Sequence, residues 1–267
     1  MTKALRLPAD CIILDLEDSV VTDRKAMARL ELKSFLNGEG RIKPIFVRIN
    51  PLASGLAQAD LSALIEHPPD GLLLPKACGK RSIEQLDLML AEQGLGDLPI
   101  MPIATETPAA IFEIGTFREV AHQLLALTWG VEDLSAAIGA IAAREEDGRF
   151  TAPYAMVRSL ALFSAHAAGV PAIETVHPNF SNKESLERVA VHAARDGFSG
   201  MLAIHPAQLE TINAAFTPSD AALERAHAIL SAFADTSGAG ALSFRGEMID
   251  APHLAQAKRL IDRAAQD

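Results

Sequence analysis

Short apolar runs alternate with longer segments of helical periodicity along most of this chain. Seven of these runs end in a residue that can bind a metal, carry a charge or move a proton. Parallel strands that alternate with covering helices produce this pattern. The runs span residues 11–18, 45–50, 71–76, 100–106, 124–133, 172–177 and 200–206. The pattern therefore predicts an α/β fold with seven parallel strands.

The expected fold class is a TIM-type (β/α) barrel. In such a barrel the C-terminal ends of the strands converge on one mouth, where the residues that end the runs would gather. These residues are Asp15, Glu17, Arg48, Lys76, Glu106, Asp133 and His205. Residues 1–10 resemble the end of a helix that runs into the first visible strand, so the barrel is expected to lack its first strand. The convergence of chemically active side chains predicts an enzyme.

The first helix is predicted from Asp23 to about Leu36, with Met27, Leu30 and Phe35 on one face. Further helices are expected at about 57–66, 81–93, 107–119, 134–143, 153–168, 182–196 and 206–215. After residue 217 the pattern changes to a C-terminal helical extension, residues 218–267. It consists of a helix at 219–234, a flexible connection with the sequence DTSGAGALSFRGEMID, and a last helix that Pro252 opens.

Composition narrows the class of protein. The chain has 267 residues, 49% of them hydrophobic, which suits a single β/α barrel domain. Its net charge of −10 and its single Tyr and single Trp make nucleic acid an unexpected partner. Cys11 and Cys78 lack the number and spacing of a disulfide framework or a zinc site. Without a signal-peptide pattern or a membrane-length apolar run, a cytoplasmic protein with no membrane partner is expected.

Glu106 and Asp133 each lie just beyond a predicted strand and are separated by one complete strand–helix unit. Neighbouring strands lie about 5 Å apart, so these carboxylates can converge on one ion and leave positions for water and substrate. Mg²⁺ is the expected ion because it prefers hard oxygen ligands. Alternatively, the two carboxylates cap the helices that begin near Pro108 and at Leu134. For a pair at one barrel mouth, metal binding is the favoured interpretation.

Arg48 and Lys76 bring positive charge to the same predicted mouth. The planar guanidinium of Arg48 suits bidentate capture of a substrate carboxylate. The alternative is an internal ion pair with Asp15 or Glu17, and both arrangements can hold together. Lys76 supplies a second positive charge for substrate or is a solvated residue at a strand end. Glu17 and Asp18 are expected to orient Lys76 or Arg48, and Glu17 is counted with the substrate-binding residues.

Several familiar catalytic motifs are absent from the sequence. There is no HExxH, GxSxG, GxGxxG or GxxxxGK[ST] pattern, which argues against a zinc hydrolase, a serine esterase, a dinucleotide site and a P-loop. His205 stands between a predicted strand and Pro206, so a structural role is expected for it.

Seven motifs, in order along the chain, resemble the citrate lyase β-subunit family, which includes malyl-CoA lyases and belongs to the HpcH/HpaI aldolase/citrate lyase superfamily. The motifs are ILDLEDSV (13–20), VRIN (47–50), LLLPK (72–76), TETPAAI (105–111), TWGVEDLSAAIG (128–139), IHPAQL (204–209) and EMIDAP (247–252). Members of that family usually begin with a strand similar to RSxLFVPG, which this chain does not show.

The resemblance implies a Mg²⁺-dependent lyase that cleaves a 3-hydroxyacyl thioester to an acetyl thioester and a 2-oxoacid. It implies a homotrimer or hexamer, with an acyl-CoA or acyl-carrier thioester as substrate. By position, Glu106 and Asp133 match the metal ligands and Arg48 the carboxylate-binding arginine. Asp250 matches the acid that a neighbouring subunit brings to the site. The C-terminal extension is accordingly expected to pack on a neighbouring subunit.

Two alternatives remain open. A pyruvate-type class II aldolase would share the Glu–Asp metal pair and need no thioester site. A non-catalytic oligomeric subunit would retain the fold without turnover. Citryl and malyl substrates are equally compatible with the sequence.

Overall fold

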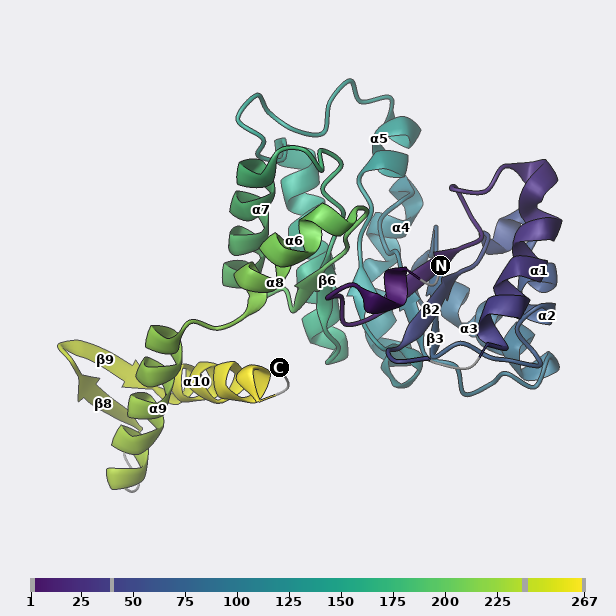
Figure 1. The fold of residues 1–267 in the computed structure, drawn as a ribbon. Coiled ribbons are helices and arrows are strands. Elements are labelled where there is room, and N and C mark those ends of the chain that lie inside the picture. Colours follow the sequence, from purple (N-terminus) through teal and green to yellow (C-terminus); the bar gives the residue numbers. More distant parts are fainter. Residues whose placement is uncertain (1–2, 39–40, 237–239, 266–267) are drawn as a thin grey trace. The chain divides into compact units, whose positions relative to one another are not determined.

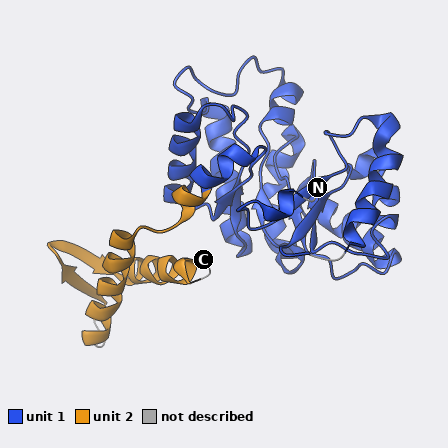
Figure 2. Cartoon of the chain, viewed as in Figure 1, with its two compact units in different colours: residues 1–212 blue, residues 213–267 orange. Residues whose placement is uncertain are grey.

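The computed structural model describes residues 3–38, 41–236 and 240–265 (Figure 1). The chain divides into two compact units, residues 1–212 and residues 213–267, which Figure 2 distinguishes by colour.

Seven parallel strands are found in the described residues of the first unit and form its centre. Strands β1 (Ile12–Asp15), β2 (Ile45–Arg48), β3 (Gly71–Leu74) and β4 (Ile100–Pro102) make one sheet, and β5 (Leu127–Thr128), β6 (Ala172–Glu174) and β7 (Gly200–Met201) make another. Two isolated parallel bridges, Ile100 with Leu124 and Ile103 with Thr128, connect β4 to the β5 segment. The strands therefore follow one another in sequence order. The predicted α/β fold with parallel strands is confirmed.

Helices connect successive strands. They are α1 (Lys25–Leu36), α2 (Ala57–Ser62), α3 (Gly79–Glu92), α4 (Pro108–Glu113), α5 (Glu132–Ile138), α6 (Ala152–Ala168), α7 (Lys183–Asp196) and α8 (Leu209–Phe216). Shorter 3-10 helices are η1 (Ala4–Arg6), η2 (Thr22–Arg24), η3 (Leu52–Ser54), η4 (Ile114–Gln123) and η5 (Pro206–Gln208). In the part of the chain that the structure describes, no helix has the length and apolarity needed to cross a membrane.

A cluster of apolar side chains packs against the parallel strands. Leu73, Met101, Ile103 and Ala126 form the buried cluster. Ile13 of β1 and Ile173 of β6 pack against it. The cluster and the two residues packed against it thus draw side chains from successive strands of the first unit.

The apolar side chains of helix α1 that are buried differ from those that the sequence placed on one face. Met27 and Leu30, placed together on one face by the sequence, are exposed, at 53% and 64%. Leu32 and Leu36 are the residues that α1 buries. Position along the helix, and not hydrophobicity alone, decides which side chains reach the sheet.

The second unit is a helix, a β-hairpin and a second helix. Its elements are α9 (Asp220–Asp235), β8 (Ala241–Phe244), β9 (Glu247–Asp250) and α10 (Ala251–Ala264). The prediction of a flexible connection between the two helices was wrong for residues 241–250, which form an antiparallel pair of strands; residues 237–239 lie outside the described part.

The hairpin forms because its sequence meets two requirements. Arg245 and Gly246 both have positive φ, as a two-residue turn between right-twisted strands needs. Ile249 is fully buried in a cluster with Ala226 and Ile229 of α9 and Ala257 of α10. The Gly, Ser and Ala content that suggested flexibility concealed this alternation of buried and exposed positions.

Candidate active site

The ends of β1 and β2 hold the first charged pair of the site. Asp15 and Arg48 are register partners at the last residues of these neighbouring parallel strands. Arg48 donates from Nε to Asp15 Oδ1 at 2.7 Å and from Nη2 to Oδ2 at 2.6 Å, which is a bidentate arrangement. Burial acts to raise the pKa of Asp15, but the hydrogen bonds from Arg48 and Ser19 outweigh it and lower that pKa to about 2. Asp15 is therefore ionised at neutral pH.

Glu17 joins this pair to Lys76. One carboxylate oxygen of Glu17 lies 3.1 Å from Arg48 Nη1, and the other accepts a hydrogen bond from Lys76 Nζ at 2.8 Å. Glu17 is only 3% exposed, and burial raises its pKa against the opposing effect of the two cations. The predicted orienting contacts from Glu17 to both Arg48 and Lys76 are thus present. No contact from Asp18 to either cation is found among the described residues.

Lys76 lies two residues after β3 in an unusual backbone conformation. Its φ is +52°, a left-handed value that costs free energy in a residue other than glycine and persists only where surrounding contacts impose it. In this conformation its backbone N–H donates to Glu106 Oε2. Its side-chain Nζ lies 3.3 Å from Asp133 Oδ2. Burial works against the charge, but the hydrogen bond to Glu17 holds the pKa of Lys76 above its usual value.

Glu106 lies near enough to Asp133 for the two carboxyls to affect each other electrostatically. Glu106 is 5% exposed, and its burial, reinforced by the neighbouring Asp133 carboxyl, raises its pKa to about 8. Gly130 makes room for it: a Cβ at this position would lie 2.7 Å from Glu106 Cγ. Gly130 is held in place by two 3.0 Å hydrogen bonds with Thr105. The turn after β5 is thus built to admit the Glu106 side chain.

The balance of charge at this cluster suits a divalent cation. Asp15, Glu17, Glu106 and Asp133 carry four negative charges when ionised, and Arg48 and Lys76 carry two positive charges, which leaves a net charge of −2. Burial is the main cause of the raised pKa of Glu106, and the neighbouring Asp133 carboxyl adds to it. A cation beside the pair would lower the cost of ionising both carboxylates. Mg²⁺ commonly takes one or two protein carboxylates and completes its shell with water and substrate oxygens. Glu106 and Asp133 fit that requirement.

Neither carboxylate caps a helix in the manner considered from the sequence. The side chain of Thr107 accepts the hydrogen bond from Ala110 N and is the N-cap of α4. Asp133 is the second residue of α5 and not its N-cap, although an anion in the first helical turn is electrostatically favoured. Both carboxylates are therefore available for a ligand.

The chain as a whole is similar to known proteins. A family model described as HpcH/HpaI aldolase/citrate lyase matches residues 1–206. The chain belongs to the HpcH/HpaI aldolase/citrate lyase family. The resemblance found in the sequence motifs is confirmed.

Three relatives of this family illustrate the similarity. The mitochondrial citramalyl-CoA lyase of Rattus norvegicus is 30% identical over 97% of this chain and 80% of its own length. A (3S)-malyl-CoA thioesterase of Cereibacter sphaeroides is 32% identical over 99% of this chain and 90% of its own length. The structure of protein CitE from Mycobacterium tuberculosis in complex with magnesium, acetoacetate and coenzyme A superimposes with a TM-score of 0.80. It is 31% identical, and the match covers 97% of this chain and 91% of that one.

Two further predicted residues, His205 and Asp250, make local contacts of their own. His205 is the N-cap of η5: its Nδ1 accepts from Ala207 N at 3.2 Å and its ring stacks on Phe180. The structural role expected for it is found. Asp250 belongs to the second unit, at the N-terminus of α10, where its Oδ1 lies 2.6 Å from His253 Nδ1.

The described residues contain no group of three or more His, Cys, Asp or Glu side chains arranged to hold a metal ion.

A buried network that the sequence did not reveal supports the β1 end of the site. Asp60 is fully buried and accepts hydrogen bonds from the backbone and side-chain nitrogens of Asn50, both at 2.7 Å, and from Arg29 Nε at 2.7 Å. Asn50 also donates to Leu16 O at 3.0 Å, and Lys25 Nζ donates to the same carbonyl at 2.8 Å. These contacts fix the backbone between Asp15 and Glu17. Asn50 lies within the VRIN motif, but nothing local to Asp60 indicated its partner.

Proposed function

We propose that this chain is a Mg²⁺-dependent carbon–carbon lyase that cleaves a 3-hydroxyacyl thioester to an acetyl thioester and a 2-oxoacid. The observation that carries the proposal is the contact of the Glu106–Asp133 pair with Lys76 and, through Glu17, with Arg48. It is supported by relatives named citramalyl-CoA lyase and by the CitE complex with magnesium, acetoacetate and coenzyme A. Malyl-CoA, citryl-CoA and citramalyl-CoA are the candidate substrates.

The residues divide the chemistry between them. Glu106 and Asp133 would hold the ion, which when bound lowers the pKa of the substrate hydroxyl and stabilises negative charge on its oxygen. Arg48, already held by Asp15 and Glu17, has N–H groups left for the substrate carboxylate. Because its guanidinium cannot rotate freely, it would fix the bond that breaks in line with the thioester π system. Lys76 stays protonated and offsets the carboxylate charge.

Bond cleavage needs a proton donor for the product. The substrate hydroxyl would give its proton to water, and its oxygen would form the carbonyl of the 2-oxoacid as the carbon–carbon bond breaks. The electron pair of that carbon–carbon bond forms the enolate of the acetyl thioester. That enolate must take a proton at carbon. We assign this step to Asp250, or to a water that it orients, delivered by the C-terminal unit of a neighbouring subunit in a homotrimer or larger oligomer.

The proposed scaffold is a β/α barrel. Two observations support it: the strands follow sequence order without the reversal that a doubly wound sheet requires, and side chains of β1 and β6 share one interior cluster. A barrel would bring the carboxyl ends of β1 to β6 to one mouth.

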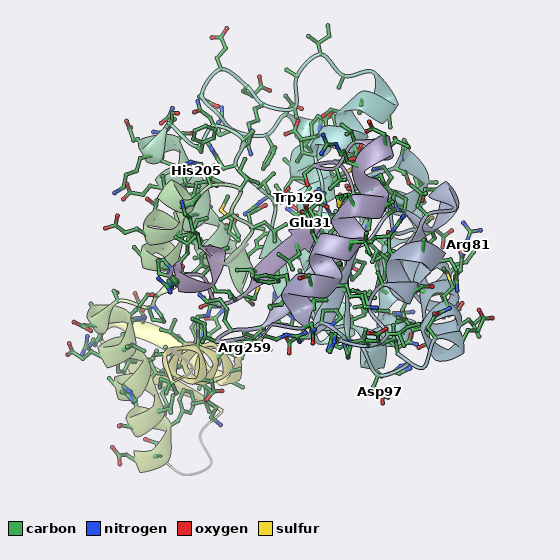
Figure 3. All side chains as sticks on the ribbon, turned by 45° about the vertical axis from the view of Figure 1, so that its right-hand side comes forward. Glu31, Arg81, Asp97, Trp129, His205 and Arg259 are labelled. Carbon is green, nitrogen blue, oxygen red and sulfur yellow. The ribbon has the colours of Figure 1, made fainter. Side chains whose placement is uncertain are left out.

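The test is a product assay with Mg²⁺ and each candidate thioester, in which acetyl-CoA and the 2-oxoacid are measured separately. The proposal predicts that both appear in equal amounts and that a chelator stops the reaction. Glu106→Gln should weaken Mg²⁺ binding in calorimetry and lower turnover at least a hundredfold, since loss of a metal contact typically costs ~10–100-fold or more. Glu31→Gln is the matched control, because Glu31 is exposed on α1 (Figure 3) and makes the same charge change away from the site.

Other outcomes have distinct meanings. Release of free coenzyme A and a hydroxyacid, without a 2-oxoacid, would show thioester hydrolysis, the activity named for the Cereibacter relative. Cleavage of a 4-hydroxy-2-oxoacid without a thioester would show a pyruvate-type aldolase. Mg²⁺ binding with no turnover on any substrate would show a non-catalytic subunit.

A further inference from the structure

A separate cavity of about 760 Å³ lies between α6, α7 and the loop that joins α5 to α6. The four arginines that line it are Arg144, Arg149, Arg158 and Arg188. Its acidic lining residues are Asp147 and Asp196, so the lining has a formal charge of +2 with His192 neutral. The whole chain has a net charge of −10. Because the cavity lining is positively charged in a chain whose net charge is negative, the cavity is suited to binding an anion.

The loop holds Arg144 rigidly at the cavity wall. Arg144 and Phe150 face each other across an antiparallel bridge, and Gly148, with φ +85°, makes the turn between them. The Arg144 guanidinium lies 3.9 Å from the centre of the Phe150 ring, and its Nη1 donates to Gly148 O at 3.0 Å. Phe150 in turn packs edge-on against the fully buried Trp129, with ring centres 5.0 Å apart. A chain of contacts from the core therefore fixes the guanidinium before any ligand arrives.

Arg144 has no direct ion-pair partner among the described residues, although the charges of Glu174 and Glu132 act on it from a distance. Its side chain is half-buried. Burial lowers the pKa of Arg144; the negative charges of Glu174 and Glu132 oppose this effect, and the positive charge of Arg158 adds to it. An arginine remains protonated in proteins even so, and a half-buried, unpaired guanidinium is stabilised by any anion that reaches its free N–H groups.

The other arginines differ in how firmly they are held. Arg158 is locked by Glu174 at 2.6 Å and Asp196 at 2.8 Å. Arg149 pairs with Asp147, and Arg188 with Glu184 one turn earlier on α7, but these pairs are exposed and contribute little to stability. Exchange of these weak pairs for a multiply charged ligand therefore costs little.

One face of α7 directs its side chains toward the same space. Ser185, Arg188 and His192 follow at intervals of three and four residues and all line the cavity. The turn of the loop approaches this face closely, since a Cβ on Gly148 would lie 3.6 Å from Ser185 Oγ. Arg188 thus lies about one helical turn along α7 from the point where the loop and the helix meet. It lines the same cavity as Arg144. Figure 1 shows α6 and α7 side by side with this loop arching above them.

We propose that this cavity binds a phosphoryl group of a small-molecule ligand, with Arg144 as its fixed anchor and Arg149 and Arg188 as mobile partners. A guanidinium presents two parallel N–H groups that match two phosphoryl oxygens. A diphosphate carries enough charge to engage more than one of the three arginines. The site is distinct from the Glu106–Asp133 cluster, with which it shares no residue, and the inference does not depend on the lyase activity.

Binding of inorganic pyrophosphate, measured by calorimetry on the full chain without Mg²⁺, tests the proposal. We expect saturable binding with one site per chain, weakened at least tenfold by Arg144→Gln and weakened less by Arg188→Gln. Arg144→Lys should recover only part of the loss because it keeps the charge without the fork. Arg81→Gln is the matched control: Arg81 is an exposed arginine of α3 and points into solvent (Figure 3). Glu106→Gln should leave pyrophosphate affinity unchanged.

Competition identifies the natural source of the group. Inorganic phosphate, ADP and coenzyme A are each titrated against bound pyrophosphate, and displacement by any of them supports the same site. Absence of pyrophosphate binding at millimolar concentration overturns the proposal. So does binding that Arg144→Gln and Arg188→Gln leave as strong as in the Arg81→Gln control. If Arg144→Gln fails to fold, Arg188→Gln alone decides, because Arg188 lies on the exposed face of α7.

Discussion

A methyl group added at Gly130 tests whether the close approach of β5 and Glu106 controls the metal site. In Gly130→Ala the new Cβ would lie 2.7 Å from Glu106 Cγ and 3.3 Å from Ile103 Cγ2. Carbon atoms at van der Waals contact are about 3.5–4.0 Å apart, so one partner must move by roughly 1 Å. Glu106 Cγ is not the free end of a flexible chain, because its carboxylate is held by Lys76 N–H and lies against Asp133.

The expected result has two parts. Overpacking at a buried position costs about 1–3 kcal/mol, which for a chain of this size lowers Tm by roughly 2–10 °C. Displacement of the Glu106 carboxylate should weaken Mg²⁺ binding about 10–100-fold, as loss of ligand orientation typically does. Calorimetric titration with Mg²⁺ and a thermal unfolding curve measure the two effects.

Gly115→Ala provides the control. Gly115 lies in η4 and a Cβ there would meet no atom within 4 Å, so Mg²⁺ affinity should not change. If Gly130→Ala binds Mg²⁺ as tightly as Gly115→Ala, then Glu106 is not positioned by this contact or is not a metal ligand. A lower Tm with unchanged Mg²⁺ affinity would contradict only the predicted effect on the metal site. The predicted loss of stability would stand.

Three further outcomes follow from the site. Arg48→Lys keeps the charge and loses the fork, so substrate binding should weaken more than stability; a collapse of Tm with normal activity per folded molecule would make Arg48 structural. Asp15, with its pKa lowered from 3.8 to about 2, stabilises the fold when ionised. Above pH ~4 the wild-type protein should therefore have a larger free energy of unfolding than Asp15→Asn, by on the order of 2 kcal/mol. This difference should vanish as pH falls through ~2, and urea titrations at several pH values measure it. Asp250→Asn mixed with Arg48→Ala should regain activity on subunit exchange, whereas verified hybrids as inactive as their parents would contradict an intersubunit role.

The sequence predicted the strands and the residues at their ends because both depend on local order. A buried strand appears as an apolar run, and a parallel arrangement brings the residues after each run together. Asp15, Glu17, Arg48 and Lys76 were found in this way, and they form one connected set of ion pairs. Which acid would bridge which base depends on side-chain geometry, and the sequence left that question open.

Features that depend on distant partners were missed. Asp60 lies on a short helix with no local signal, yet its burial and its bonds to Asn50 and Arg29 support the β1 end. Residues 241–250 have the composition of a linker, and they fold because Ile249 reaches apolar side chains of two helices. The cavity beside α6 joins a loop and two helices, so no single motif encodes it. Local patterns carry no information on such contacts.

Trp129 gives the protein a built-in optical reporter. It is the single tryptophan of the chain, its indole N–H donates to Glu174 at 2.6 Å, and its ring meets Phe150. It also directly precedes Gly130. The one tyrosine, Tyr154, is likewise in the first unit, and residues 213–267 contain neither. Fluorescence emission therefore follows the first unit alone, while circular dichroism follows the helices of both. Differing transitions by the two methods would show that the units unfold separately, without any label attached to the chain.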